Sequence, residues 1–382
     1  MVHPTGRAAG HDLTDGPLGA SIISHECYAN VAPVGMLQAP ADARILRPMS
    51  NTVAYQADDR SILLPFYKRF LIEPTLPLIP ASVHPNTITH AGHLVCLAGL
   101  LLLAAYNPSK GWLFLASMAL LQAYNWCDNA DGAHARRTKQ SSVLGEFLDH
   151  GLDVLNTLYI GLMTIFALGS SPEYAIALAI LIPAAPPMTI WEQTETGVYR
   201  LGMLNQIESI MVLSFVMVVD AVFGTHVWHD IRLGPLSAYD FFHLWPIVTI
   251  LFGYGRAMWR VYQANRPVGP ALAFLCAHGA VAVAGVTHST SLHVAIAFSI
   301  GVNVYFGARM LALRFRGERP RVEPLLVAVA LGLGVYGVMH RYGLALPTDV
   351  GAALTVLACS VIGYQSLRET RDSMASLGRI EG

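Results

Sequence analysis

The chain has 382 residues, of which 54% are hydrophobic and only 13% charged, and its mean hydropathy is +0.47. Because a typical soluble domain carries about 25% charged residues, this composition excludes an ordinary soluble protein and predicts an integral membrane protein. The formal net charge of −1 says little about partners, because in a bilayer the positions of the charges matter more than their sum, and we expect no nucleic-acid partner. The five cysteines are scattered without metal-ligand spacing, so we expect neither a disulfide framework nor a zinc site.

The first 80 residues divide into two parts. Residues 1–55 mix Gly, Pro, Ala and Asp without sustained periodicity, and no charged-then-apolar leader precedes a cleavage site. We expect a partly disordered cytosolic extension without a signal peptide. Residues 56–80 contain a short amphipathic run that prolines interrupt, which predicts a helix lying at the membrane interface rather than a span.

The rest of the chain predicts an all-α, polytopic membrane fold. Apolar stretches, most of them near the roughly 20 residues that a bilayer requires, predict about ten transmembrane helices. They lie at 87–106, 111–135, 144–169, 173–191, 206–227, 241–262, 268–287, 291–313, 323–340 and 349–367. Pro183, Pro186 and Pro187 are expected to kink the fourth helix. We divide this part into 81–227, the further helices of 228–368, and a cytosolic tail at 369–382.

The distribution of basic residues predicts the orientation of these helices. If the turn that contains Arg136 faces the cytoplasm, all but three of the 24 Lys and Arg residues lie on the cytoplasmic side. The exceptions are Lys110, Arg232 and Arg341. The positive-inside rule therefore predicts that both termini are cytosolic, in either a bacterial inner membrane or the endoplasmic reticulum.

Four aspartates form the most informative pattern in the sequence. Asp128 and Asp131 are three residues apart, and Asp149 and Asp153 are four apart, so each pair projects from one face of its helix. A polar turn between the two helices lets them pack antiparallel with the acidic faces opposed. Four carboxylates in a low-dielectric setting are costly without a cation, and oxygen-only ligands favour Mg²⁺ or Mn²⁺. The alternative is a pair of helices whose carboxylates are structural.

Small residues and an arginine accompany the aspartates. Gly132, Ala135 and Gly145 leave room for a bulky polar ligand between the two backbones. Arg136 supplies a fixed cation for phosphate. Together with the carboxylates, these residues predict a diphosphate site.

The full pattern resembles the signature of the class I CDP-alcohol phosphotransferases. Asp128-x-x-Asp131-Gly132-x-x-Ala135-Arg136, then eight residues, then Gly145-x-x-x-Asp149-x-x-x-Asp153, is similar to that signature at every fixed position. The segment Pro85-Asn86-x-x-Thr89 is also similar to this family, although Asn86 could instead cap a helix. The region from Trp191-Glu192 to Glu208 resembles the choline and ethanolamine phosphotransferase branch. One departure is Ala133-His134, where the family pattern has Lys-Gln.

The resemblance implies a function and a set of site residues. Residues 81–227 would hold the catalytic helices, in which two Mg²⁺ or Mn²⁺ ions bind Asp128, Asp131, Asp149 and, in part, Asp153. A hydroxyl group would attack the phosphorus distal to cytidine, and CMP would leave. The implied substrate-binding residues are Asn86, Gly132, Ala135, Arg136 and Gly145.

The general base is not determined by the sequence. The wider family nominates Asp153, and the branch nominates His278 together with Glu208. Glu208 and His278 each interrupt an apolar helix, where an ionisable group is costly without a partner. For His278, a neutral imidazole bonded to a backbone carbonyl is an equal interpretation.

Two substrate assignments and one different class of protein remain open. The favoured donor is CDP-choline or CDP-ethanolamine, with diacylglycerol as the lipid acceptor. Alternatively, CDP-diacylglycerol is the donor and a small polar alcohol accepts. A cation-coupled transporter would also use intramembrane carboxylates, but it does not explain Gly132, Ala135 and Arg136 at fixed offsets. A homodimer is possible in each case.

Overall fold

The computed structural model describes most of the chain after residue 55. The described residues are 56–105, 111–203, 205–286, 292–344 and, near the C-terminus, 361, 363–365, 367–368, 370–372 and 374–375. The predicted N-terminal extension, most of the predicted tenth helix at 349–367 and most of the tail therefore lie outside the described residues.

The described part is mostly helical and follows the predicted helices to within a few residues. The long helices are α3 (Pro85–Ala104), α4 (Trp112–Thr138), α5 (Val143–Leu168), α6 (Pro172–Leu181), α7 (Ala185–Thr196), α8 (Gln206–Phe223), α10 (Ala238–Gln263), α11 (Gly269–Val286), α12 (Leu292–Arg316) and α13 (Pro324–Arg341). The predicted fourth helix is two helices, α6 and α7, because a turn that contains Pro183 separates them. Pro186 and Pro187 lie in the first turn of α7, where a missing N–H is tolerated.

Five helical stretches are long and apolar enough to cross a membrane. They are Pro85–Ala104, Val143–Leu168, Pro172–Thr196, Gln206–Phe223 and Ile296–Arg316, and two shorter apolar stretches are Gly269–Val283 and Pro324–His340. Helix α4 is not among them because polar side chains, including Gln122, Asn125 and Asp128, interrupt its apolar sequence. The described residues thus have the helices of an integral membrane protein, and the count of ten spans stays a prediction.

The predicted amphipathic segment is a run of short helical turns. It consists of α1 (Leu64–Tyr67), the π-helical η1 (Lys68–Ile72), α2 (Glu73–Thr75) and the 3₁₀ turn η2 (Leu76–Leu78). Ile62, Phe66 and Phe70 are at least half exposed, whereas Ile72 is buried. Trp126 of α4 donates its Nε1–H to Thr75 Oγ1 at 2.8 Å, which fixes the segment to the helical bundle.

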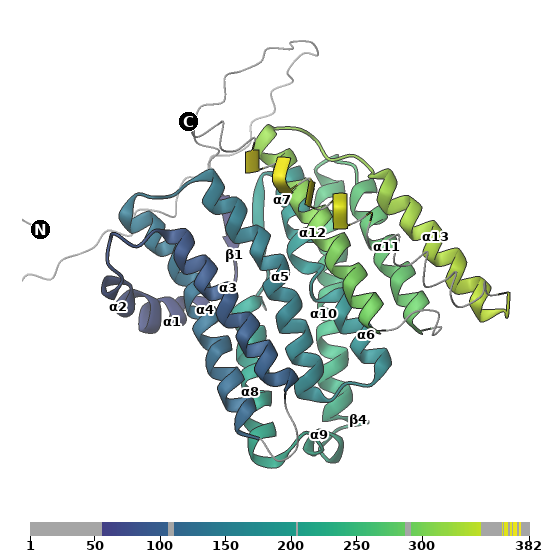
Figure 1. Cartoon of the computed structure of the whole chain (residues 1–382), viewed down its shortest axis with the longest axis horizontal. Helices are drawn as coiled ribbons and strands as arrows, with labels where there is room; N and C mark the ends of the chain where they lie inside the picture. The colour runs from purple at the N-terminus through teal and green to yellow at the C-terminus, as the bar shows by residue number, and fades with distance from the viewer. Residues whose placement is uncertain are drawn as a thin grey trace, which may run out of the picture. The chain divides into compact units, whose positions relative to one another are not determined.

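Two small sheets correct the all-α prediction. Strand β1 (Gln56–Asp59) pairs in parallel with β2 (Val198–Leu201), so that Asp58 lies opposite Arg200. Strand β3 (Arg232–Leu233) pairs antiparallel with β4 (Leu236–Ser237) next to the short helix α9 (Val227–Asp230). In Figure 1, α9 and β4 lie at the opposite end of the helices from β1.

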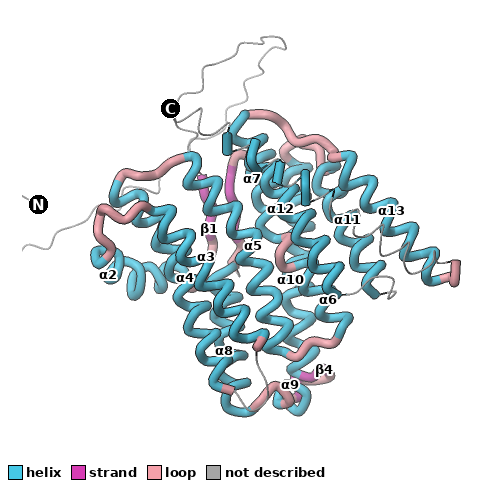
Figure 2. The backbone as a smooth tube through the Cα atoms, viewed as in Figure 1, coloured by secondary structure: helices cyan, strands magenta, loops and turns pink. Residues whose placement is uncertain are grey.

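Helix α5 lies between two packed groups of helices (Figure 1, Figure 2). On one side it contacts α3 and α8, which together with α4 form a core that contains Phe114, Tyr124 and Met163. On the other side it contacts α6, α7 and α12, where the core contains Phe274 and Phe306. Residues from both groups can therefore reach the N-terminal half of α5, where the predicted site residues lie.

Candidate metal and substrate site

A tight turn sets α4 and α5 antiparallel. Lys139 ends α4 in the left-handed conformation, with φ of 58°, and the Gln140 N–H donates to Ala135 O at 2.9 Å. Ser142 begins α5 as its N-cap, since its Oγ accepts the Gly145 N–H at 2.9 Å. The acidic faces of the two helices are opposed as a result.

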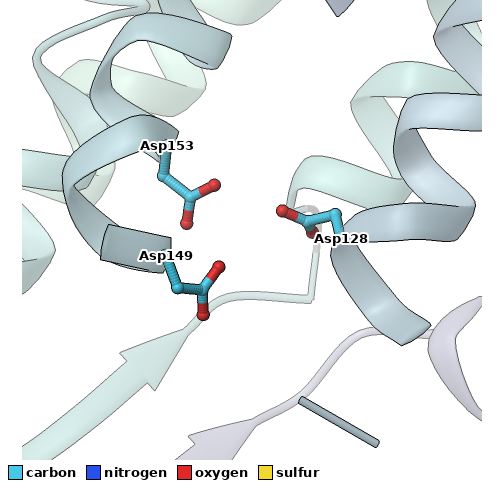
Figure 3. Close-up of side chains that lie close together, drawn as sticks. All are labelled: Asp128, Asp149 and Asp153. Atoms are coloured by element: carbon cyan, nitrogen blue, oxygen red, sulfur yellow. The ribbon is translucent and has the colours of Figure 1, made fainter. Parts of the chain in front are cut away.

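Three of the four predicted aspartates converge. Asp128 of α4 and Asp149 and Asp153 of α5 each offer a carboxylate oxygen, and these oxygens all lie within 4.8 Å of one another. Figure 3 shows the three side chains pointing toward a common space between the helices. The Asp153 Oδ1 atom is buried and has no hydrogen-bond partner. A charged oxygen in this condition is costly unless a cation or a ligand donor satisfies it.

Asp131 is not one of the three carboxylates that lie within 4.8 Å of one another. Its side chain is 4% exposed, its Oδ2 accepts the Thr89 hydroxyl of α3 at 2.6 Å, and its Oδ1 accepts the Gly132 N–H. The predicted four-carboxylate cluster is therefore a group of three with a fourth carboxylate oriented by α3. The Pro85-Asn86-x-x-Thr89 pattern has a structural explanation here, because Thr89 positions Asp131.

The group of three fits a hard divalent cation. All its donors are carboxylate oxygens, and no Lys or Arg among the described residues forms an ion pair with Asp128, Asp149 or Asp153. Uncompensated carboxylates at this spacing match the oxygen ligand sets of Mg²⁺ and Mn²⁺.

Gln206 is a site residue that the sequence analysis missed. It is the first residue of α8, and its Nε2 donates to Asp128 Oδ2 at 3.1 Å and to the Tyr124 hydroxyl at 2.8 Å. The Tyr124 hydroxyl in turn lies 3.4 Å from Asp128 Oδ1. These contacts orient Asp128 toward α5. The available signal was a polar residue at the start of an apolar helix that also contains Glu208.

His150 was also missed as a candidate, although it follows Asp149 directly. Its ring is buried, with Nε2 3.9 Å from Glu146 Oε1 and Nδ1 3.9 Å from Asp153 Oδ2. The ring stacks on Tyr199 of β2, with centroids 4.9 Å apart. The helical spacing of Glu146, His150 and Asp153 was the signal that would have identified it.

Gly145 and Asn86 lie together at the start of α5. A Cβ atom at Gly145 would lie 3.1 Å from Ser142 Oγ and 3.2 Å from Asn86 Oδ1, so glycine permits this close approach. Asn86 does not cap α3, because the N-cap is His84, whose Nδ1 accepts the Asn86 N–H at 3.2 Å. The Asn86 side chain instead faces the α4–α5 region.

Arg136 differs from its neighbour Arg137. Arg136 is exposed in the last turn of α4 and makes no hydrogen bond or ion pair within the described part of the chain, and its Nη1 would lie 3.4 Å from a Cβ at Gly132. Arg137 donates to Ile79 O at 2.6 Å and to His134 Nδ1 at 3.0 Å. Arg136, whose guanidinium has no such bonds among the described residues, is therefore the better placed of the two to bind a phosphate.

His134, the departure from the family pattern, has a structural role. It is completely buried, and because its Nδ1 accepts from Arg137, its Nε2–H is the donor to Val83 O at 2.8 Å. These bonds hold the loop before α3 against the end of α4.

Glu208 lies at the start of α8 and is fully occupied by hydrogen bonds. Its Oε1 accepts the Ser61 hydroxyl at 2.6 Å and the Leu63 N–H at 2.9 Å, and its Oε2 accepts the Asn205 N–H at 3.0 Å. It completes a capping box with Asn205 and fixes the segment after β1 to α8. The geometry gives Glu208 a structural role, and a catalytic role stays a prediction.

His278 lies in α11, and its side chain is buried. Its Nδ1 is 2.9 Å from Phe274 O, one turn earlier, and its ring packs against the Phe274 ring with centroids 4.4 Å apart. This is the backbone-bonded arrangement that the sequence left as the alternative to a base.

Three partly buried ion pairs involve Glu192 and Glu146, and two of them reach later helices. Arg260 of α10 binds Glu192 of α7 through two hydrogen bonds of 2.6 Å, and Arg200 of β2 binds the same carboxylate at 3.1 Å. Arg314 of α12 pairs with Glu146, the residue that faces His150. The carboxylate side of α5 is therefore supported by helices well beyond the aspartate pattern.

Residues 82–236 match the family model described as CDP-alcohol phosphatidyltransferase. This stretch contains the three converging aspartates, Asp131 and Gln206. The match to this family model therefore coincides with the stretch that contains the aspartate pattern.

Several curated proteins are similar to part of this chain. Cholinephosphotransferase 1 of Xenopus laevis is 30% identical over 210 residues, which cover 52% of this chain and 51% of the relative. Ethanolaminephosphotransferase 1 of Homo sapiens is 29% identical over 192 residues, covering 46% of this chain and 48% of the relative. CDP-diacylglycerol–serine O-phosphatidyltransferase of Encephalitozoon cuniculi is 37% identical over 154 residues, covering 38% and 40%. The chain spans about half the length of the curated relatives it matches.

Proposed function

We propose that this protein transfers a phosphoalcohol group from CDP-choline or CDP-ethanolamine to the hydroxyl of diacylglycerol and releases CMP. The observation that carries the proposal is the convergence of Asp128, Asp149 and Asp153 within 4.8 Å, inside a domain of the CDP-alcohol phosphatidyltransferase family. Similarity to a cholinephosphotransferase and an ethanolaminephosphotransferase supports this choice of donor.

The three carboxylates would hold divalent cations. Two Mg²⁺ or Mn²⁺ ions bound there would neutralise the diphosphate and stabilise negative charge on the attacking and leaving oxygens. Asp131 is a further ligand in this proposal, because the hydrogen bond from Thr89 orients its carboxylate and leaves lone pairs free.

Other residues of α3, α4 and α5 would position the donor. The exposed guanidinium of Arg136 binds a phosphate of the nucleotide, since it has no competing partner among the described residues. Gly132 and Ala135 have no bulky side chains, so they leave room for the donor on the α4 surface beside Arg136. Asn86 and Gly145 border the start of α5, where Asn86 can donate a hydrogen bond to the substrate.

His150 is the best-placed general base. A hydroxyl is a poor nucleophile at neutral pH, so a base must accept its proton. The His150 Nδ1 atom lies 3.9 Å from Asp153 Oδ2, whereas Glu208 caps α8 and His278 is bonded to a backbone carbonyl. We therefore assign proton transfer to His150 with Asp153 as its partner, in place of Glu208 and His278.

The membrane arrangement belongs to the same proposal. Ten spans, with both termini in the cytosol, place the carboxylates near the cytoplasmic surface, where a soluble CDP-alcohol is available. The exposed side chains of Ile62, Phe66 and Phe70 fit a segment that lies in the membrane interface.

A second assignment has specific support. The relative with 37% identity is a CDP-diacylglycerol-dependent enzyme that acts on serine. In that case CDP-diacylglycerol is the donor and a small polar alcohol accepts, with the same carboxylates and the same departure of CMP.

A donor assay separates these assignments. The purified protein is incubated with labelled CDP-ethanolamine, CDP-choline or CDP-diacylglycerol, each with its acceptor, in the presence of Mg²⁺ or Mn²⁺. We expect CMP from CDP-ethanolamine or CDP-choline only when diacylglycerol and the metal ion are both present. Release of CMP from CDP-diacylglycerol with its acceptor, and from neither of the other two donors, would favour the second assignment. Cation-driven uptake into vesicles without any CMP would instead indicate a transporter.

A further inference from the structure

A polar pocket of about 410 Å³ lies where α7 ends, between β2 and the end of α10. Its volume is within the range of roughly 300–1,000 Å³ that small-molecule sites occupy. Arg200, Arg260 and Arg266 line it, together with Glu195. None of these residues belongs to the aspartate pattern.

Strand β2 separates this pocket from the carboxylate site. Successive side chains of a strand point to opposite faces, and here Tyr199 stacks on His150 while Arg200 binds Glu192. The pocket therefore lies at the same end of the helices as the carboxylates but on the other face of β2.

The pocket has an excess of positive charge. Arg200 and Arg260 share the single buried carboxylate of Glu192, and Arg266 makes no hydrogen bond or ion pair within the described part of the chain. A guanidinium has five donor hydrogens, so all three arginines retain donors for a ligand. This arrangement favours a phosphate group.

Glu195 imposes a second requirement on a ligand of this pocket. It is 6% exposed, and its Oε1 atom is buried without a hydrogen-bond partner. A buried carboxylate oxygen needs a donor, and the nearby phosphate-binding arginines leave this one unsatisfied. The complementary ligand therefore carries a cationic donor close to its phosphate.

Two aromatic residues indicate that the pocket lies at the membrane surface. Trp259 and Tyr262, in the last turns of α10, are 59% and 63% exposed, and their ring centroids are 5.9 Å apart. Exposed Trp and Tyr at a helix end are typical of the headgroup level of a bilayer. A ligand in the pocket is thus within reach of lipid headgroups.

We propose that this pocket binds a phospholipid headgroup that combines a phosphate with a primary ammonium group, as phosphoethanolamine does. The phosphate contacts Arg266 and the free donors of Arg200 and Arg260, and the ammonium group donates to Glu195 Oε1. This second lipid site is independent of the proposed reaction, because it shares no residue with the carboxylate site.

Equilibrium binding to the purified full chain tests the proposal. Native mass spectrometry in detergent would measure the dissociation constants of short-chain phosphatidylethanolamine and of phosphatidylglycerol, which has the phosphate without the ammonium group. We expect Arg266→Gln to weaken both lipids by about tenfold, the effect of losing one charge-assisted hydrogen bond. Glu195→Gln should weaken phosphatidylethanolamine by about tenfold and change phosphatidylglycerol by less than about twofold. The matched control Arg256→Gln, in α10 but not among the residues that line the pocket, should change neither lipid.

Three outcomes would overturn the proposal. The first is phosphatidylethanolamine binding that neither pocket variant weakens more than Arg256→Gln does. The second is inorganic phosphate at equal concentration displacing the lipid, which would make the pocket a site for free phosphate. The third is binding that Asp149→Asn abolishes and Arg266→Gln leaves unchanged, since the lipid would then occupy the carboxylate site. Loss of CMP release in any variant does not bear on these results.

Discussion

At the scale of single residues, chemically similar side chains have different roles because their surroundings differ. Asp153 retains a buried oxygen without a partner and faces two other carboxylates, whereas both oxygens of Glu208 accept hydrogen bonds. From the sequence, Glu208 and His278 are grouped with the catalytic candidates because burying an ionisable side chain in an apolar helix is costly without a partner. The sequence could not show that Ser61 and Leu63, about 145 positions away, satisfy Glu208.

Replacing Glu208 separates a structural role from a catalytic one. In Glu208→Gln the N–H donors of Leu63 and Asn205 lose a charged acceptor, which costs about 1–2 kcal/mol of stability. We expect a lower thermal unfolding temperature and CMP release within a fewfold of the wild type. Ser61→Ala, which removes one donor and leaves the carboxylate, should show a smaller shift. A loss of activity of more than about a hundredfold with unchanged unfolding would show that Glu208 is catalytic.

Replacing His150 and replacing His278 should affect kcat differently. His150→Ala should lower kcat by about 10²–10⁴-fold, the usual contribution of a general base. His278→Gln should leave kcat within a fewfold, because the wild-type ring bonds Phe274 O and packs in the core. Rates of CMP release at saturating donor measure both. The reverse ranking would restore His278 as the base.

At the scale of elements, hydropathy and prolines predicted the positions of the helices, and local capping explains their ends. The break between α6 and α7 follows from Pro183, and the α4–α5 turn from Ser142 and the polar residues before it. The β1–β2 sheet was not predictable, because two four-residue strands more than a hundred residues apart leave no local pattern. Gln206 and the contact of Thr89 with Asp131 were missed for the same reason, since they join residues of different helices.

The close contact of α3 with α4 predicts a stability effect. A Cβ atom at Gly92 would lie 2.8 Å from Cys127 Cβ, so Gly92→Ala must separate the two helices. We expect a loss of about 1–3 kcal/mol, seen as a lower unfolding temperature in fluorescence-detected gel filtration. Gly253→Ala in α10 is the matched control, because nothing lies within 4 Å of its Cβ position. Equal unfolding temperatures for the two variants would contradict this packing of α3 on α4.

At the scale of the whole molecule, the carboxylate site depends on helices outside the family match. The matched stretch ends at residue 236, but Arg314 of α12 pairs with Glu146, whose carboxylate lies 3.9 Å from His150 Nε2. The sequence anticipated additional helices in 228–368 without indicating these contacts. The later helices therefore support the site as well as the membrane fold.

The predicted orientation of the chain is testable with single cysteines. In a background without the native cysteines, Arg319→Cys and Arg232→Cys place a thiol at two exposed positions. The positive-inside rule predicts that a membrane-impermeant maleimide labels them from opposite sides, with Arg319→Cys reached from the cytosol. Labelling of both from one side would contradict the proposed topology.

Metal binding is the central claim, and Mn²⁺ titration followed by electron paramagnetic resonance tests it most directly. The purified protein should bind one or two Mn²⁺ ions, and Asp149→Asn should lose at least one because it removes a ligand from the group of three. Asp58→Asn, at an exposed carboxylate outside that group, should bind as the wild type does. Wild-type Mn²⁺ binding by Asp149→Asn, or no binding by the unaltered protein, would contradict a metal-dependent transfer at these three aspartates.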